Sequence, residues 1–175
     1  MQRSTRVVRR DSTDADLCDA AAQVATHAYA PYSRFAVGAA VRTKRGVYTG
    51  SNLENAAYGV SICAEVSALA AANSAGDFDI QAIAVVGHPE GDPNAGKKIV
   101  TPCGRCRQLI YEASNVSGVD ISVFCCNGDL SEQHTYLISE LLPEGFGPSN
   151  LGVDVSLYRS KRMRSSGLPK KRSGG

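Results

Sequence analysis

Hydrophobic positions along the first third of the chain change from a helical to an extended period. Residues 14–29 place apolar side chains at helical spacing, and two aspartates in the first turn suit a helix N-terminus. Residues 35–41 and 47–49 are mostly apolar, small or β-branched, and they flank a Lys-Arg-Gly turn at residues 44–46. This pattern predicts a helix followed by a hairpin of two strands.

Two later segments predict further helices. Ser61 can cap a helix that runs to about Ser74, because alanines dominate the residues between them. Pro102 and Gly104 stand where another helix starts, and we expect that helix to run to about Ala113.

Apolar segments after these helices predict the remaining strands. Residues 80–87 and 119–125 are rich in β-branched and apolar residues, and residues 135–142 predict a short strand or helix. Residues 88–98, rich in glycine, proline and charge, predict a loop. Strands that alternate with helices imply a sheet covered by helices on its faces. The helical crossovers imply that its later strands are parallel.

Length and hydropathy favour one globular domain with tails. Within the 175 residues we expect a basic N-terminal extension at 1–12, a folded domain at 13–155 and a basic, disordered tail at 156–175. A run of about eighteen apolar residues, which a membrane span needs, does not occur. The arginine-rich start lacks the apolar stretch of a secretory signal, so we expect a cytoplasmic protein.

Charge is distributed unevenly along the chain. Of the 19 basic residues, four lie in residues 1–10 and seven in residues 159–175, and neither segment contains an acidic residue. Residues 11–158 therefore hold eight basic against 17 acidic residues. An acidic body does not resemble a groove for nucleic acid, so no nucleic-acid partner is expected. A solvated segment is the simpler interpretation of the basic tail, although such a tail could still touch nucleic acid.

Six cysteines in a chain without a secretory signal favour metal binding or catalysis over a disulfide framework. Cys63 lies near the start of the helix expected at 61–74, and Cys103 and Cys106 lie at the start of the next helix. A helix N-terminus stabilises a thiolate, and cysteines three residues apart can hold one ion. Three protein ligands would leave zinc a fourth position for water, which is typical of a catalytic site.

Glu65, two residues after Cys63, is a candidate proton carrier. It is too close along the chain to share the metal easily. Its carboxylate is well placed to accept a proton from a water on the metal and to deliver that proton to a substrate. Spacing alone leaves two alternatives open. They are a redox Cys-x-x-Cys pair and a structural zinc site closed by a fourth ligand such as Cys125, Cys126 or His88.

The segment from Tyr29 to Leu151 resembles the small cytidine deaminases, which hold zinc with three cysteines and assemble as homotetramers. The Cys-Ala-Glu triplet and the later Pro-Cys-x-x-Cys match the signature of zinc deaminases. The resemblance implies a three-layer α/β/α fold with a mixed central sheet of about five strands. The matching segments, in order, are residues 32–40, 50–58, 62–65, 102–108 and 140–151.

The resemblance also implies an activity. The expected reaction is hydrolysis of cytidine and 2′-deoxycytidine to uridine and 2′-deoxyuridine, with release of ammonia. Cys63, Cys103 and Cys106 would hold one Zn²⁺ per subunit, and Glu65 would move the protons. The active sites would be shared within the homotetramer, and Tyr58 matches a position at the subunit contacts.

Five further positions match substrate-binding residues of the family. Asn52 and Glu54 match a pair that hydrogen-bonds the ribose hydroxyls, and Phe35 matches a residue that lines the nucleoside pocket. The backbone at Ala64 matches groups that read the pyrimidine, and Phe146 matches an aromatic that reaches over the base from a neighbouring subunit. Judged one by one, these residues could equally be core residues, turn caps or loop anchors. Only their joint order favours function.

The chain departs from the family pattern at two places. Val66 follows Glu65 where the family often has an arginine that offsets the thiolate charge, and we expect Arg105 or Arg107 to supply that charge. Residues 88–98 form an insert that is longer and richer in glycine and proline than expected. This insert could alter the rim of the pocket.

Three functions compete at this stage. The first is deamination of free cytidine and 2′-deoxycytidine. The second is deamination of a modified cytosine nucleoside or a nucleoside antibiotic, for which Val66 and the insert leave room. The third is a structural-zinc module that binds nucleic acid through the basic tail. Deamination of polynucleotides is disfavoured because the acidic body offers no evident groove for a single strand.

Overall fold

The computed structural model describes residues 13–156 and residue 158. The extension expected at 1–12 and nearly all of the tail expected at 156–175 lie outside the described residues. The helices and strands, in chain order, are α1 (Asp14–Ala25), β1 (Phe35–Thr43), β2 (Val47–Ser51), α2 (Ala64–Ser74), β3 (Ile80–Pro89), α3 (Gly104–Ser117), β4 (Ser122–Cys126), β5 (Gln133–Leu137) and α4 (Ile138–Leu141). Short 3-10 turns occur at Tyr58–Val60, Pro93–Ala95 and Pro148–Leu151.

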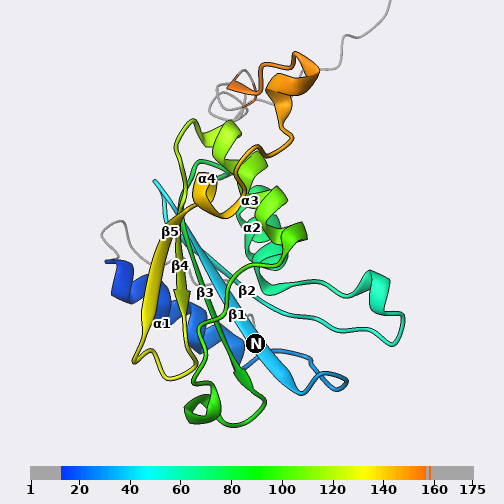
Figure 1. Cartoon of the computed structure of the whole chain (residues 1–175), viewed down its shortest axis with the longest axis vertical. Coiled ribbons are helices and arrows are strands. Elements are labelled where there is room, and N and C mark those ends of the chain that lie inside the picture. Colours follow the sequence, from blue (N-terminus) through cyan, green and yellow to red (C-terminus); the bar gives the residue numbers. More distant parts are fainter. Residues whose placement is uncertain (1–12, 157, 159–175) are drawn as a thin grey trace, which may run out of the picture.

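The five strands form one mixed sheet in the order β2-β1-β3-β4-β5 (Figure 1). β1 is antiparallel to both β2 and β3, and β3 is parallel to β4, as the crossover through α3 requires. The prediction that the later strands are parallel is wrong for β4 and β5, which are antiparallel. Only residues 127–132 join these two strands, and a connection that short permits only an antiparallel neighbour.

Helices cover both faces of the sheet, which confirms the three-layer α/β/α prediction. Of the described helices, α1 covers one face, and α2, α3 and α4 lie on the other (Figure 1). Two separate apolar cores result, because successive strand residues point to opposite faces. Under α1 the buried residues include Leu17, Ala21, Ala84 and Phe124, and under the other helices they include Leu69, Ile83, Ile110 and Val123.

Two glycines let helices approach the sheet closely. A Cβ at Gly38 of β1 would collide with the backbone of α1 at Ala21 and Ala25. A Cβ at Gly50 of β2 would collide with the backbone of α2 at Ala68. The hairpin therefore sits in direct contact with a helix on each face, which fixes where α2 begins relative to the sheet.

The helix starts differ from the sequence expectation in one informative place. Ser61 is not the N-cap of α2, because the helix begins at Ala64 and Cys63 is its N-cap in an extended conformation. The hydroxyl of Ser61 instead accepts a hydrogen bond from the Asn55 amide at 3.0 Å. α3 runs past the expected end at Ala113 to Ser117. Among the described residues, none of the helices is long and apolar enough to cross a membrane.

Candidate active site

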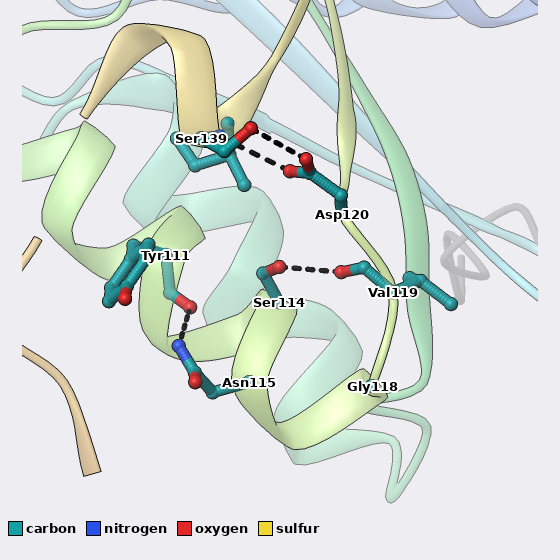
Figure 2. A pocket seen from close by; sticks show the side chains of 8 residues that line it. Tyr111, Ser114, Asn115, Gly118, Val119, Asp120 and Ser139 are labelled. Carbon is teal, nitrogen blue, oxygen red and sulfur yellow. Dashed lines mark hydrogen bonds between the residues drawn. The ribbon is translucent and has the colours of Figure 1, made fainter. Parts of the chain in front are cut away.

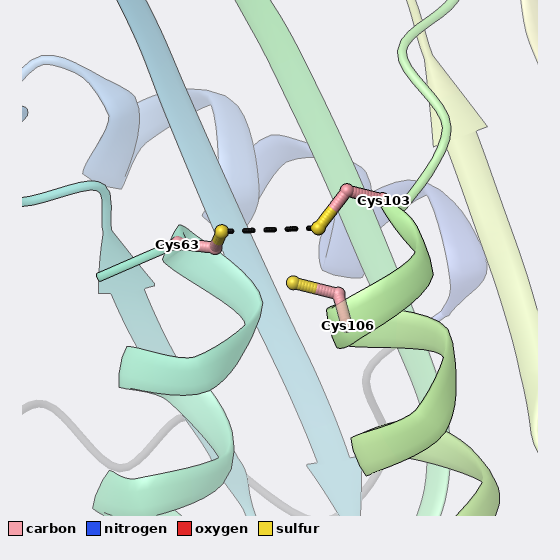
Figure 3. A group of neighbouring side chains, drawn as sticks. All are labelled: Cys63, Cys103 and Cys106. Carbon is pink, nitrogen blue, oxygen red and sulfur yellow. Dashed lines mark hydrogen bonds between the residues drawn. The ribbon is translucent and has the colours of Figure 1, made fainter. Parts of the chain in front are cut away.

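Three cysteines meet where α2 and α3 begin (Figure 3). Cys63 is the N-cap of α2, Cys103 is the N-cap of α3, and Cys106 lies one turn into α3. Their sulfur atoms all lie within 4.8 Å of one another, and the sulfurs of Cys63 and Cys103 are 4.0 Å apart. We call these three residues the cysteine cluster. Two helix N-termini with unpaired N–H groups thus point at the same place and favour negative charge there.

The cysteine cluster fits a zinc ion. Three sulfurs that each lie about 2.3 Å from one tetrahedral zinc would lie about 3.8 Å apart, close to the spacing observed. In the described part of the chain, no fourth histidine, cysteine or carboxylate belongs to this group. The alternative ligands Cys126 and His88 have other partners, namely the Cys18 thiol and the Pro89 carbonyl. A site with three protein ligands leaves room for a water or substrate.

The surroundings of the cluster oppose the charged form of two of its thiols. Burial raises the pKa of Cys63 and of Cys106. Burial acts in the same sense on Cys103, but the Cys106 amide and the thiols of Cys106 and Cys63 outweigh it and lower the pKa of Cys103. The charge of Glu65 acts to raise the pKa of all three thiols. A divalent cation between the sulfurs would lower the pKa of the thiols and so favour the thiolates.

Glu65 lies in the first turn of α2, directly beside the cluster. Its side chain is only 4% exposed, and it forms a hydrogen bond with the Cys106 thiol. Burial raises the pKa of the Glu65 carboxyl, although its own amide and the Cys106 thiol act against that rise. A shielded carboxyl at this position can hold and release a proton next to the sulfurs.

Two arginines of α3 brace the segments that carry the cysteines. Arg105 donates from Nη1 to the Ser61 carbonyl at 3.2 Å. Arg107 donates from Nε to the Pro102 carbonyl at 2.8 Å and from Nη1 to the Leu141 carbonyl at 3.0 Å. The carbonyl oxygens of Ser61 and Pro102, which lie just before the cysteines in the chain, therefore hold the two guanidinium groups in place. Compensation of thiolate charge by these two residues stays a prediction.

Arg107→Gln is expected to lower the turnover of the substrate by about 10- to 100-fold, the usual cost of removing a group just outside the metal ligands. Arg107 is half-buried and makes two short bonds, whereas Arg105 is exposed and makes one longer bond, so Arg105→Gln should cost less. Arg107→Lys keeps the charge without the planar fork and separates the two roles. Unchanged rates in both glutamine variants would refute a role for either arginine.

Backbone pairing places Asn52 and Glu54 beside the cluster. Leu53, between them, exchanges hydrogen bonds with Ile62 at 2.9 and 2.8 Å, and Ile62 directly precedes Cys63. Asn52 accepts from the Val37 amide at 2.9 Å and donates to the Phe35 carbonyl at 3.0 Å. Asn52 therefore fixes the start of β1 and keeps one further N–H and one lone pair for a ligand.

Two residues without an assigned role in the sequence analysis hold Glu54 in place. One carboxylate oxygen of Glu54 accepts from the Tyr32 amide at 3.0 Å and from the Ser33 amide at 3.2 Å. Hydrogen bonds from Ser33 lower the pKa of Glu54, although partial desolvation acts in the opposite direction. Tyr32 and Ser33 lie in one of the segments that resemble the deaminases, residues 32–40. The sequence does not indicate, however, that their backbone amides bind Glu54.

Phe35 is the first residue of β1, and Ala64 is the first residue of α2. Phe35 opens β1 and is half-buried, and a Cβ at Gly87 would come within 2.8 Å of its ring and within 2.9 Å of Val100. Gly87 therefore lets the ring pack flat against β3. Ala64 is fully buried as the first residue of α2, between Cys63 and Glu65.

Phe146 does not lie within the cluster of predicted site residues of its own chain. Its side chain is 59% exposed, on the loop that follows α4. Gln108 of α3 donates to the Phe146 carbonyl at 2.7 Å. A Cβ at Gly145 or Gly147 would meet the ring of Tyr111. The loop thus packs on α3, and the Phe146 side chain is exposed to solvent. Gln108, which binds this loop, is a functional candidate that its residue type alone does not indicate.

A separate open depression of about 350 Å³ lies at the far end of α3 from the cysteine cluster (Figure 2). Its polar groups bind one another. Ser139 donates to the Asp120 carboxylate at 2.6 Å, and Asn115 donates to the Tyr111 carbonyl at 2.8 Å. The depression contains none of the predicted site residues.

Comparison with known proteins agrees with this location. Residues 11–122 match the family model described as the cytidine and deoxycytidylate deaminase zinc-binding region. A protein of Halalkalibacterium halodurans named cytidine deaminase is 45% identical over 129 residues, which cover 72% of this chain and 88% of that protein. A cytidine deaminase of Mycobacterium tuberculosis is 38% identical over 136 residues, which cover 75% of this chain and 87% of that protein.

Solved structures give the same result. The crystal structure of cytidine deaminase from Burkholderia pseudomallei superposes with a TM-score of 0.68 at 37% identity, and the match covers 77% of this chain and 100% of that chain. The crystal structure of cytidine deaminase from Mycobacterium tuberculosis superposes with a TM-score of 0.62 at 34% identity, and it covers 78% and 99%.

Proposed function

Because the chain belongs to the cytidine and deoxycytidylate deaminase family, we propose that it hydrolyses the amino group of cytidine to give uridine and ammonia. One observation carries the proposal. Three cysteine sulfurs lie within 4.8 Å of one another, with a carboxyl that is 4% exposed beside them and no fourth side-chain ligand among the described residues. Hydrolysis needs an activated water and a proton carrier, and this arrangement provides for both.

The zinc ion of this family is proposed to bind to Cys63, Cys103 and Cys106. When bound, zinc supplies a Lewis acid that lowers the pKa of a water molecule. The chain contributes the two helix N-termini that stabilise the thiolates and the arginine contacts that brace the segments around them. The proposed ligands lie at the starts of the helices because the free backbone N–H groups there stabilise thiolates.

Glu65 carries the protons in the proposed mechanism. Its carboxylate accepts a proton from the attacking water and passes it to ring nitrogen N3 of the pyrimidine. The oxygen of that water bonds to the carbon that bears the amino group, the C=N bond becomes single and the carbon becomes tetrahedral. Glu65 then transfers the remaining proton of the new hydroxyl to the amino group, the C–N bond breaks, the carbonyl forms and ammonia leaves. Burial of Glu65 keeps bulk water from competing for the proton, and its pKa, raised by burial, suits a group that both accepts and donates.

The substrate is proposed to be a free nucleoside, either cytidine or 2′-deoxycytidine. Asn52 and Glu54 are proposed to bind the sugar hydroxyls, Phe35 to line the pocket and the backbone at Ala64 to read the pyrimidine. Support comes from the Leu53–Ile62 pairing, which joins the segment that carries both polar residues to the residue before Cys63. Glu54 is held in the ionised form by the Tyr32 and Ser33 amides and keeps its second oxygen as an acceptor.

Incubation of the purified chain with cytidine, 2′-deoxycytidine and free cytosine tests this proposal by loss of the cytosine absorbance. We expect both nucleosides to react and free cytosine to react far more slowly, because it lacks the sugar. Activity only on modified nucleosides would replace the substrate. Zinc without any deamination would end the proposal.

We also propose a homotetramer with shared active sites. The described residues expose several large apolar side chains, and a contiguous patch of such side chains usually marks an interface. The most exposed are Tyr58 at 74%, Leu151 at 68%, Val60 at 64% and Phe146 at 59%. Phe146 is proposed to reach over the base bound to a neighbouring subunit. The domain at 13–155 and the cytoplasmic location stay predictions.

Mixing two inactive variants tests whether active sites are shared. Phe146→Ala should be weak because each subunit lacks a partner's ring, and Glu65→Gln should be inactive because it lacks the proton carrier. In mixed oligomers formed by co-expression, a Phe146→Ala subunit receives an intact ring from a Glu65→Gln neighbour, so its activity should rise. No gain in mixed oligomers of confirmed composition would mean that Phe146 does not act across subunits.

A further inference from the structure

A pair of buried thiols lies on the face of the sheet opposite the cysteine cluster. Cys18 belongs to α1 and is 3% exposed, and Cys126 ends β4 and is 1% exposed. Both belong to the core beneath α1. Their sulfur atoms are 3.2 Å apart, with Cys126 donating and Cys18 accepting. Two sulfurs from elements 108 residues apart in the chain therefore meet, with no part in the proposed hydrolysis.

The neighbouring residue Cys125 shows that this meeting is specific. It is fully buried like Cys126 and lies on the same strand, but its side chain faces the other core, beneath α2 and α3. Buried single cysteines usually behave as small apolar residues. Cys125 fits that description, whereas Cys18 and Cys126 face each other directly.

The thiol pair also has a route to solvent. Cys18 donates its own S–H to the side-chain oxygen of Gln133 at 3.3 Å. Gln133 is exposed on β5, the edge strand of the sheet. Cys18 is therefore one side chain away from water, and α1 is the only described helix on this face. A hydrogen bond from Cys126 lowers the pKa of Cys18, although burial and the nearby aspartates act in the opposite direction. The lower pKa favours the Cys18 thiolate as the attacking sulfur.

We propose that Cys18 and Cys126 are an oxidation site, at which a hydroperoxide converts the two thiols into an intramolecular disulfide that joins α1 to β4. The Cys18 thiolate attacks one peroxide oxygen, an S–O bond forms, the O–O bond breaks and water leaves. The Cys126 sulfur then attacks the Cys18 sulfur, the S–S bond forms, the S–O bond breaks and a second water leaves. Two thiols thus lose two electrons and two protons, and hydrogen peroxide becomes two waters.

The geometry allows this step with small movements. A disulfide needs the sulfurs about 2 Å apart, so rotation of the two side chains has to bring them about 1 Å closer. The cross-link would close a loop of more than 100 residues, which restricts the unfolded chain strongly. Because the bond lies on the opposite face from the cysteine cluster, zinc content is expected to be unchanged.

The test treats the full zinc-loaded chain with a few equivalents of hydrogen peroxide. We expect the intact mass to fall by about 2 Da, the mass of the two hydrogens that a disulfide removes. A peptide pair linking Cys18 to Cys126 should appear in the non-reduced digest. The midpoint of thermal unfolding should rise by several degrees and return after a reducing agent is added. Bound zinc is measured in the same samples.

Three variants complete the test. Cys18→Ala and Cys126→Ala should each abolish the mass loss and the thermal shift, and either one serves if the other fails to fold. Cys125→Ala is the matched control and should keep both effects. The proposal is overturned if the digest contains no Cys18–Cys126 link, or if the link forms only after zinc has been released. None of these readouts depends on deaminase activity, so the result is independent of the proposed function.

Discussion

Glu65→Gln is expected to lower kcat for cytidine by about 10⁴-fold, at the upper end of what a positioned proton carrier contributes. The substitution keeps the size of the side chain and removes its ability to accept a proton. The effect should be large because Glu65 is the buried carboxyl beside the cysteine cluster, at 4% exposure. Zinc content should equal that of the parent chain, because the three proposed ligands are sulfurs of other residues.

Steady-state kinetics and zinc analysis on the same preparations check this prediction. Glu65→Asp keeps a carboxylate but shortens the side chain by one methylene. Its rate should therefore lie between those of the parent chain and Glu65→Gln. A near-normal rate in Glu65→Gln would show that another group moves the proton. Loss of zinc from Glu65→Gln would mean that the residue supports the metal instead.

Cys106→Ala is expected to abolish both zinc binding and turnover. Cys106 is the fully buried member of the cluster, and its removal leaves two sulfurs from two different helices. Changes just outside a metal's ligands cost about 10- to 100-fold in affinity, so loss of a ligand should exceed about 100-fold. The variant should also unfold at lower temperature, because metal binding contributes to folding free energy.

Cys125→Ala is the matched control for this experiment as well. It removes an equally buried thiol, which belongs to the core beneath α2 and α3 and lies outside the cluster. Zinc content and activity should therefore stay close to those of the parent chain, with only the stability cost of a small cavity. Retention of zinc in Cys106→Ala, or its equal loss in both variants, would contradict the proposed ligand set.

The grouping of the three cysteines with Glu65 nearby could be predicted from sequence because these residues lie within short segments. Cys63 and Glu65 are two residues apart, Cys103 and Cys106 are three apart, and each pair begins an apolar helical pattern. Helix N-termini and metal ligands both act over one turn, so a local pattern is enough. The resemblance to known deaminases then supplied the order of the segments.

The start of α2 could not be predicted in the same way. Ser61 is a good cap by residue type, but backbone pairing between Ile62 and Leu53 holds the chain extended until Cys63. That pairing is a long-range contact, and local propensity carries no information about it. The same pairing joins the segment that carries Asn52 and Glu54 to the residue before Cys63, and local patterns do not indicate that contact either.

The last strand shows a second limit. β5 is short and mostly exposed at the edge of the sheet, and its sequence Gln-His-Thr-Tyr-Leu lacks a clear alternation of apolar and polar residues. A strand with one half-buried residue has little hydrophobic pattern to detect. Its antiparallel direction follows from the short turn after β4, which only the folded chain makes evident.

X-ray absorption at the zinc edge of the purified chain tests the central claim most directly, because it counts and identifies the atoms around the metal. The cysteine cluster predicts three sulfurs at about 2.3 Å and one oxygen or nitrogen at about 2.0 Å. A shell of four sulfurs, or a folded chain that binds no zinc, would contradict the account.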